Sequence, residues 1–592
     1  MRSQLPVRST QFSFPISMSK YAVALLCFAF NIHPLFAHEN LDWRYHGKDL
    51  SNQRFQDVDQ INPSNVAKLK PAWIFHTGVF DPNMSMEMTP VVVDGVMYVP
   101  TGDDDVFALD AATGKKIWAY HPTDMPPLSS LPICCNNDNR GVAVGHGKVF
   151  NARLDATLVA LDAKSGKVVW KTTVDLPSNG AAMTIAPQFA DNKVIVGVSG
   201  AEYGVRGHLD AYDPDTGKLI WRFWTTEPTT WEGDSYLHGG AVVWGNPSYD
   251  PDLHTLYFAT GNAYPWPWAG DRAGTNLYSS SIVAVDVRDG KLKWYFQNAH
   301  HDMWDFDGPQ PTVLFDFHGI PALSHTSKTG FMFIVDRRTG QSLYPYQEVP
   351  VPPTPPEAAF QHPWPTQPES SIESLTEHQA ELPLPAGYIA APMWTTFQPT
   401  PMVFQPLFDG GMEWPPAAYS PRTHFIYSHA RFVPADVGIT DSPANDANCP
   451  TSQTCTFTGT FSIPGVKNHG VYGAVDTRTG KVAWKIPMTT APDSGVGVAG
   501  DLVFFGDSTG LFHAADAKTG EILWTFDAST VPNAGGATAS PAIYVVNGRE
   551  YVVYGFGGNP GESPILGDAV IAFALPDHDD DHGGDHGGDH DD

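Results

Sequence analysis

The chain has 592 residues, of which 42% are hydrophobic and 17% charged, and its formal net charge is −29. This acidic excess argues against nucleic acid as a partner, because phosphate backbones attract cationic surfaces. With 54 glycines, 52 prolines and 12% aromatic residues, the composition favours an all-β chain over a helical one.

The N-terminus has the features of a cleavable export signal. Lys20 precedes an apolar run, residues 21–30, that is too short to span a bilayer, and Ala37 supplies a small residue for cleavage. We therefore expect residues 1–37 to be removed and the mature protein to be periplasmic, with no stable membrane anchor. An uncleaved anchor is the alternative.

One phrase recurs along the chain, most often as A-x-D-x-x-T-G-K-x-x-W. Its seven copies occupy residues 108–118, 160–170, 211–221, 284–294, 334–344, 474–484 and 514–524. Each copy describes a hairpin, in which one strand ends at Asp, Thr-Gly makes a tight turn and a second strand ends in an aromatic residue. Such a hairpin cannot bury its own faces and must stack on copies of itself.

An eighth copy is split between the chain ends. Residues 570–575 resemble the first strand of the phrase, and residues 69–73 resemble the second. Pairing them in one blade would close a ring and remove exposed sheet edges. We predict an eight-bladed β-propeller over residues 38–576, with tryptophan-docking repeats and one blade closed by both termini.

Two segments depart from the repeat. Residues 350–464 lengthen one repeat interval and are Pro-rich, which predicts long insertions within one blade; a separate small domain is the alternative. Residues 577–592 are rich in Asp and His, and we expect a solvated, disordered tail, with a weak metal-collecting tract as the alternative.

Four cysteines remain after the predicted cleavage: Cys134, Cys135, Cys449 and Cys455. In an oxidising compartment they can pair. A bond between the adjacent Cys134 and Cys135, two free thiols, and pairing with Cys449 and Cys455 all stay open. The chain has no C-x-x-C-H, so we expect no covalently attached haem.

Further polar residues stand where propeller turns do not require them. Glu202 lies among small residues, and Asn262 follows the expected strand 255–260. Asp305 and Asp307, in the segment HDMWDFDG, would point to one face of an extended chain. Two such anions repel unless a cation lies between them, and oxygen ligands suit Ca²⁺ or a similar hard ion rather than Zn²⁺.

The chain resembles the methanol and alcohol dehydrogenases that depend on pyrroloquinoline quinone (PQQ). The resemblance covers nearly the whole mature chain and rests on the repeats and on CCNNDNRG, SGAEYGVRGHL, TGN and HDMWDFDG, in this order. It implies that PQQ lies in a central funnel, between a vicinal disulfide of Cys134 and Cys135 on one face and Trp244 on the other. The other cofactor-binding positions that it implies are Arg140, Thr184, Ser199, Gly200, Ala201, Lys328 and Glu413.

The same resemblance implies a metal site and a mechanism. Glu202, Asn262 and Asp305 match metal ligands, Asp305 matches the general base, and Lys328 matches a cation beside the quinone oxygens. Lanthanide-using members resemble Trp-Asp-Tyr-Asp where this chain has residues 304–307, so Asp307 would be an additional ligand. We therefore favour a lanthanide(III) ion over Ca²⁺. The alternative for Asp307 is a solvent-facing or turn-capping side chain.

The resemblance implies oxidation of a primary alcohol to the aldehyde by hydride transfer to PQQ, with a soluble cytochrome c as the electron acceptor. A homodimer is left open. Three departures from the family pattern, Val242 for Thr, Glu413 for Asn and no Trp near Asp493, do not support methanol as the substrate. The alternative function is a non-catalytic or degenerate propeller that acts as an envelope scaffold.

Overall fold

The computed structural model describes residues 41–378, 384–440, 457–460 and 463–576. The predicted signal, the Asp/His-rich tail, Cys449 and Cys455 lie outside the described residues. Within the described ranges, regular structure consists of β-strands and short 3-10 helices, with no α-helix. The prediction of an all-β chain is confirmed. No helix in these ranges is long and apolar enough to cross a membrane.

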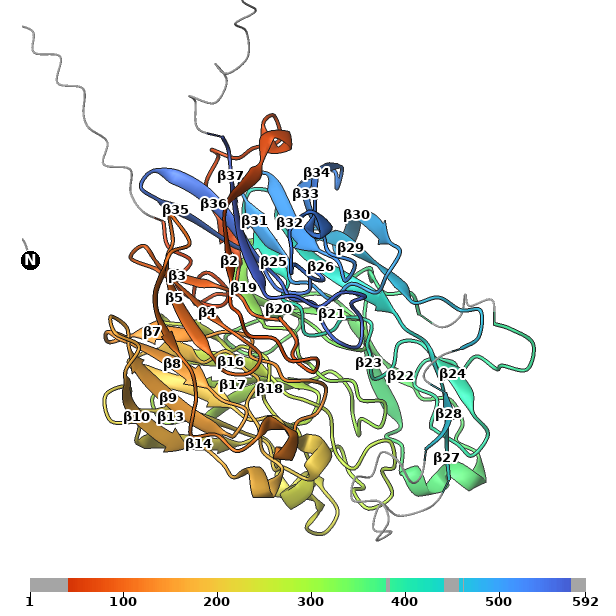
Figure 1. The fold of residues 1–592 in the computed structure, drawn as a ribbon. Helices are drawn as coiled ribbons and strands as arrows, with labels where there is room; N and C mark the ends of the chain where they lie inside the picture. Colours follow the sequence, from red (N-terminus) through yellow and green to blue (C-terminus); the bar gives the residue numbers. More distant parts are fainter. Residues whose placement is uncertain (1–40, 379–383, 441–456, 461–462, 577–592) are drawn as a thin grey trace, which may run out of the picture. The chain divides into compact units, whose positions relative to one another are not determined.

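Successive antiparallel strands form one sheet after another along the chain (Figure 1). The first four sheets contain β3 (Val91–Val93), β4 (Val96–Pro100), β5 (Val106–Asp110) and β6 (Lys116–Tyr120); β7 (Ala143–Gly145), β8 (Lys148–Ala152), β9 (Thr157–Asp162) and β10 (Val168–Thr173); β11 (Gln188–Ala190), β12 (Lys193–Gly197), β13 (His208–Tyr212) and β14 (Leu219–Trp224); and β15 (Ser248–Asp250), β16 (Thr255–Ala259), β17 (Ser281–Asp286) and β18 (Leu292–Gln297).

The next three sheets continue this order. They contain β19 (Val313–Phe317), β20 (Ile320–Thr326) and β21 (Met332–Asp336); β25 (Ala418–Ser420), β26 (Phe425–Phe432), β29 (His469–Asp476) and β30 (Lys481–Met488); and β31 (Gly497–Ala499), β32 (Leu502–Gly506), β33 (Leu511–Asp516) and β34 (Ile522–Asp527), to which β1 (Phe55–Gln56) adds in parallel.

Both ends of the described chain meet in one further sheet. Its strands are β35 (Ala542–Val546), β36 (Arg549–Phe556), β37 (Ala569–Ala574) and β2 (Lys70–His76). β2 pairs antiparallel with β37, from Lys70 opposite Ala574 to His76 opposite Ala569. The red β2 and the dark blue β37 lie side by side in Figure 1. The two segments that resemble halves of an eighth repeat therefore pair as one hairpin does.

The predicted insertion, residues 350–464, supplies strands to three sheets. β25 and β26 belong to a four-stranded sheet already described. The remaining strands form two small sheets, β22 (Tyr346–Pro350) with β23 (Thr366–Ser370), and β24 (Met402–Phe404) with β27 (Ala435–Ile439) and β28 (Phe457–Thr460).

The repeated Asp closes each turn. In the first copy, Asp110 Oδ1 accepts hydrogen bonds from the backbone N–H groups of Ala112 and Thr113, at 3.1 and 2.9 Å. Gly114 then adopts a φ of +70°, which a residue with a Cβ rarely adopts. The repeated sequence phrase therefore specifies a hairpin whose turn is capped by the Asp side chain.

The repeated Trp docks one hairpin on the next. Trp118 covers Gly166 of the following copy so closely that a Cβ on Gly166 would lie 2.5 Å from the indole ring. Its Nε1 donates to the Ala163 carbonyl at 3.0 Å. In the other copies an aromatic ring likewise covers the turn glycine of the next hairpin. The rings are those of Trp73, Trp170, Trp221, Trp294, Tyr344 and Trp484. These contacts link consecutive sheets along the chain.

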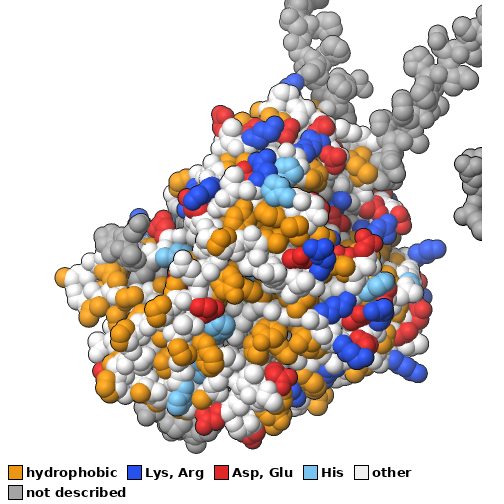
Figure 2. Space-filling view, turned by 180° about the vertical axis from the view of Figure 1, so that it is seen from behind, with side chains coloured by type: hydrophobic (Ala, Val, Ile, Leu, Met, Phe, Trp, Pro, Cys, Tyr) orange, Lys and Arg blue, Asp and Glu red, His pale blue; other side chains and the backbone are white. Residues whose placement is uncertain are grey.

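The apolar core lies between neighbouring sheets, where the first strand of each repeat is almost entirely buried. The outer strands instead expose single apolar side chains, such as Ile117, Val169 and Tyr295. On the face drawn in Figure 2, Lys and Arg side chains lie among Asp and Glu side chains rather than in a field of one sign.

Candidate active site

Every site residue predicted from the sequence lines one cavity of about 720 Å³. These residues come from loops at the ends of strands in several sheets and are separated by up to 279 positions in the chain, from Cys134 to Glu413. They are Cys134, Cys135, Arg140, Thr184, Ser199, Gly200, Ala201, Glu202, Trp244, Asn262, Asp305, Asp307, Lys328 and Glu413.

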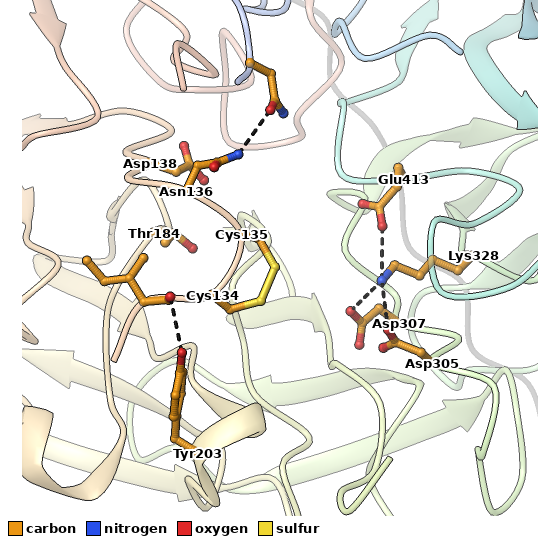
Figure 3. The surroundings of a disulfide bond; sticks show 12 residues. Cys134, Cys135, Asn136, Asp138, Thr184, Tyr203, Asp305, Asp307, Lys328 and Glu413 are labelled. Carbon is orange, nitrogen blue, oxygen red and sulfur yellow. Dashed lines mark hydrogen bonds and ion pairs between the residues drawn. A yellow bond between two sulfur atoms is a disulfide. The ribbon is translucent and has the colours of Figure 1, made fainter. Parts of the chain in front are cut away.

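The loop with the two adjacent cysteines forms one wall. Cys134 and Cys135 are joined by a disulfide, which selects one of the pairings that the sequence left open (Figure 3). The loop is held on both sides of this bond: the Tyr203 hydroxyl donates to the Ile133 carbonyl at 3.3 Å, and Asn136 Nδ2 donates to Asn559 Oδ1 at 3.1 Å.

Arg140 projects a guanidinium group into the cavity. Its Nη2 lies 2.7 Å from Glu87 Oε2 and 2.7 Å from Asp138 Oδ2, and its Nη1 donates to Thr184 Oγ1 at 2.9 Å. Burial raises the pKa of the Glu87 and Asp138 carboxyls, although Arg140 opposes this effect. The buried Nε of Arg140 has no partner among the described residues, so a donor is left for a ligand.

Two indole rings enclose the Arg140 side chain. The guanidinium carbon lies 4.8 Å from the ring centre of Trp244 and 5.1 Å from that of Trp414. Both rings line the cavity. A flat anionic ligand would therefore find aromatic surface and a forked donor in one place.

A lysine and three carboxylates form the opposite wall (Figure 3). Lys328 Nζ lies 3.1 Å from Glu413 Oε1, 3.2 Å from Asp307 Oδ2 and 3.8 Å from Asp305 Oδ2. Burial alone would lower the pKa of Lys328, but these carboxylates raise it well above the ordinary value. The side chain is therefore a permanent cation.

The carboxylates outnumber this cation. Burial raises the pKa of Asp305 well above its usual range, with additional contributions from Asp307, Asp302 and Glu202, and only Lys328 opposes them. Burial also raises the pKa of Asp302 to about 6. A further cation at this wall would relieve the repulsion between the carboxylates.

The local backbone explains how Glu202 and Asn262 reach this wall. Glu202 lies in a single 3-10 turn (Ala201–Tyr203) between Gly200 and Gly204, whose φ angles are +105° and +81°. A Cβ on Gly200 would lie 2.0 Å from the Gly180 carbonyl oxygen, so only glycine fits. Asn262 follows β16, and its backbone N–H donates to Asp307 Oδ1.

The donor set fits a hard metal ion. Glu202, Asn262, Asp305 and Asp307 line the cavity with the kind of oxygen atoms that a hard ion prefers, and burial and the charge of Asp307 raise the pKa of Glu202. In the described part of the chain, no three His, Cys, Asp or Glu side chains are already clustered as metal ligands. The Lys328 ammonium lies among the carboxylates instead.

Several cavity residues escaped the sequence analysis. Asp138 lies in the motif CCNNDNRG but was not singled out, and the others belong to no repeat phrase and to no motif that marks a site: Glu87, Asp409, Trp414, Arg431, Asn559 and Glu562. Trp414 could have been identified from the sequence, because it directly follows the predicted site residue Glu413. Of the three departures from the family pattern, Val242 and Glu413 line the cavity, and Asp493 accepts a hydrogen bond from Trp414 Nε1 at 3.1 Å.

Comparison with known proteins agrees with this site. The family model "Glucose/ethanol/alcohol dehydrogenase, beta-propeller domain" of PQQ proteins matches residues 43–552. A quinohemoprotein alcohol dehydrogenase of Pseudomonas putida is 34% identical over 499 residues, which are 79% of this chain and 67% of that protein. A lanthanide-dependent methanol dehydrogenase of Methylorubrum extorquens is 34% identical over 506 residues, 78% of each chain.

Two solved structures show the same architecture. A europium-containing methanol dehydrogenase superposes with a TM-score of 0.76 at 26% identity, over 90% of this chain and 98% of that one. The quinohemoprotein alcohol dehydrogenase of Comamonas testosteroni superposes with a TM-score of 0.74 at 28% identity, over 90% and 80%. The propeller-type fold is thereby confirmed, and the chain belongs to the family of PQQ-dependent alcohol dehydrogenases.

Proposed function

We propose that this protein oxidises a primary alcohol to the aldehyde in the periplasm, by hydride transfer to bound PQQ. One observation carries the proposal: residues scattered along the chain bring a disulfide, Trp244, Arg140 and the Asp305–Lys328 pair to the walls of one cavity. A scaffold has no use for buried carboxylates with raised pKa values that face a cavity.

We further propose that the sheets form a closed ring of eight blades. The described strands include eight sheets that carry the repeat or its split copy. Docked aromatic side chains lead from Trp73 through the successive repeats to Trp484, and the Trp524 ring lies 5.2 Å from Phe573 in the sheet of both termini. A ring of this kind leaves no sheet edge open.

The cofactor supplies the hydride acceptor, while the protein binds and orients it. In the cavity, Trp244 and the Cys134–Cys135 disulfide would lie against its two faces, and Arg140 would pair with a cofactor carboxylate. Thr184, Ser199, Gly200, Ala201 and Glu413 line the remaining space. The unpartnered Nε of Arg140 supports this placement.

We propose a lanthanide(III) ion at Glu202, Asn262, Asp305 and Asp307, with Ca²⁺ as the alternative. Asp307 faces the same cavity as Asp305 and is 6% exposed, which supports a ligand role over a solvent-facing side chain. The additional carboxylate suits a trivalent ion with a large coordination shell.

Asp305 is the group that would accept the hydroxyl proton of the alcohol. Burial raises the pKa of Asp305 well above its usual range, which suits a group that takes up a proton, and the Lys328 ammonium 3.8 Å away opposes this effect. The same ammonium stabilises negative charge that develops on oxygen at this wall. Because the sequence contains no C-x-x-C-H, the electrons would leave to a separate soluble cytochrome c.

The test is reconstitution of the purified apo-protein with PQQ and either La³⁺ or Ca²⁺, followed by dye-linked oxidation of a series of primary alcohols. We expect turnover by the wild type and a loss of at least about a hundredfold in Asp305→Asn, since a positioned base contributes about 10²–10⁴-fold. Asp289→Asn, in an exposed repeat turn, is the matched control and should retain full activity. Absence of PQQ binding by folded wild-type protein would refute the proposal.

A further inference from the structure

Asp493 joins two parts of the cavity wall. Its Oδ1 accepts hydrogen bonds from Trp414 Nε1 at 3.1 Å and from Arg431 Nη1 at 3.2 Å, and its Oδ2 accepts one from Asn559 Nδ2 at 3.2 Å. The residue is 1% exposed. This buried carboxyl group therefore accepts hydrogen bonds from three donors that come from different segments of the chain.

Asn559 extends this connection to the disulfide loop. Its Oδ1 accepts from Asn136 Nδ2 at 3.1 Å, and its Nδ2 lies 3.5 Å from Glu87 Oε1 (Figure 3 shows the Asn136 contact). Asn136 directly follows Cys135, and Glu87 holds Arg140. Asn559 itself lies in the loop between β36 and β37, in the sheet of both termini.

We infer that Asp493 and Asn559 are positioning residues that fix the distance between the Trp414 wall and the Cys134–Cys135 loop. This inference rests on the proposed function, because the two walls would enclose PQQ. We call Asp493 and Asn559, joined by the hydrogen bond from Asn559 Nδ2 to Asp493 Oδ2, the bracket.

The contacts of Asp493 and Asn559 predict how substitutions at the two positions combine. Trp414 and Trp244 flank Arg140, whose partner Glu87 also contacts Asn559. Removing either residue breaks the Asp493–Asn559 hydrogen bond, through which the indole of Trp414 is connected to the loop of Asn136. The two residues therefore act as one unit, and their substitutions should not be additive.

The first experiment is a double-mutant cycle on the apo-protein with Asp493→Ala, Asn559→Ala and both together. PQQ affinity is measured from the quenching of tryptophan fluorescence. We expect each single variant to weaken binding by about fivefold for each hydrogen bond lost between the walls, and the double variant to bind no more weakly than the weaker single variant. Unchanged affinity in the single variants, or fully additive losses, would overturn the bracket.

A second readout needs no cofactor. Thiol release from the Cys134–Cys135 disulfide by dithiothreitol should be about fivefold faster in Asn559→Ala, because the loop loses the Asn136–Asn559 hydrogen bond, and less accelerated in Asp493→Ala, which keeps that bond. Thr423→Ala is the control: it removes a buried hydrogen bond to Tyr427 at 2.7 Å, at the start of β26 and away from the cavity. Equal acceleration in this control would show general destabilisation and would refute the positioning role.

A double exchange of the two residues distinguishes a positioning role from a loss of folding. In the exchange D493N/N559D, an amide at position 493 can donate to a carboxylate at position 559, whereas N559D alone places two carboxylates opposite each other and D493N alone places two amides there. We expect the double exchange to recover most of the PQQ affinity that the single exchanges lose. No recovery in a folded double variant counts against the bracket. Wild-type protein that binds no PQQ at all contradicts the proposed function instead.

Discussion

The Lys328 ammonium lies 3.2 Å from Oδ2 of Asp307, closer than it lies to Asp305 at 3.8 Å. Asp307, whose carboxylate is the reason for proposing a lanthanide, is therefore also the nearer of the two aspartates to the buried Lys328 ammonium. A metal ion bound at Asp307 would weaken its pairing with Lys328, because the ion competes for the same oxygen atoms. Glu413, 3.1 Å from Lys328, would then remain as the counter-ion.

Replacing Asp307 should change the metal preference. We expect Asp307→Ala to weaken lanthanide binding by on the order of 10–100-fold or more, since even residues behind the ligands of a metal have effects of this size, and Ca²⁺ binding to fall less. Terbium luminescence, excited through neighbouring tryptophans, measures the affinity directly. Asp307→Asn is the informative companion, because it keeps an acceptor for the Asn262 N–H and removes the charge. Equal lanthanide affinity in all three proteins would show that Asp307 is no ligand.

Replacing Arg140 by lysine should weaken PQQ binding. Arg140→Lys keeps the charge but loses the planar fork that contacts Glu87, Asp138 and Thr184 at once and stacks between two indoles. We expect PQQ affinity to fall by at least about tenfold, as for a lost charge-assisted hydrogen bond, while the thermal midpoint changes little. Equilibrium dialysis of PQQ against both proteins measures the effect. Arg338→Lys, on an exposed repeat turn, is the matched control.

Tryptophan docking can be tested by adding one methyl group. Gly290 and Gly147 share a φ of +70°, but a Cβ on Gly290 would lie 2.6 Å from the Trp221 ring, whereas a Cβ on Gly147 meets nothing within 4 Å. Both alanine variants carry the backbone strain, and only Gly290→Ala adds the clash. We expect it to be less stable than Gly147→Ala by about 1–3 kcal/mol in urea unfolding. Indistinguishable midpoints would mean that the ring moves aside at no cost.

Glu550 should make the fold less stable at higher pH. Burial raises its pKa to about 7, although the Ile61 N–H donates to its Oε2 at 2.9 Å. The folded state therefore keeps a proton that the unfolded chain releases near its ordinary pKa of 4.5, so stability falls as pH rises between these values. The loss is at most about 3 kcal/mol.

Glu550→Gln removes this titration and keeps the acceptor. The unfolding midpoints of the two proteins should thus diverge in favour of the variant from pH 4.5 to about pH 7, between the two pKa values, and run parallel at higher pH. Thermal scans at fixed ionic strength measure the difference. Curves that stay parallel between pH 4.5 and about pH 7 would contradict the raised pKa of Glu550.

The sequence by itself determined the repeating unit and part of the cavity lining. Asp, Gly and Trp at fixed spacing encode a capped hairpin that docks on its neighbour, because capping and turn conformation depend on residues a few positions apart. The resemblance to the PQQ dehydrogenases then named residues such as Cys134, Arg140 and Asp305, and the structure places all of them on one cavity. Their roles as ligands and base remain predictions.

Only the tertiary structure decided which residues join these walls. Arg431, Asp493 and Asn559 belong to no repeat phrase, and their hydrogen bonds connect segments that are 62 and 66 positions apart. The enclosure of Arg140 by Trp244 and Trp414 likewise depends on how sheets from distant parts of the chain meet. Local spacing carries no information on such contacts, because the packing of one sheet against the next sets the distance between side chains in different loops.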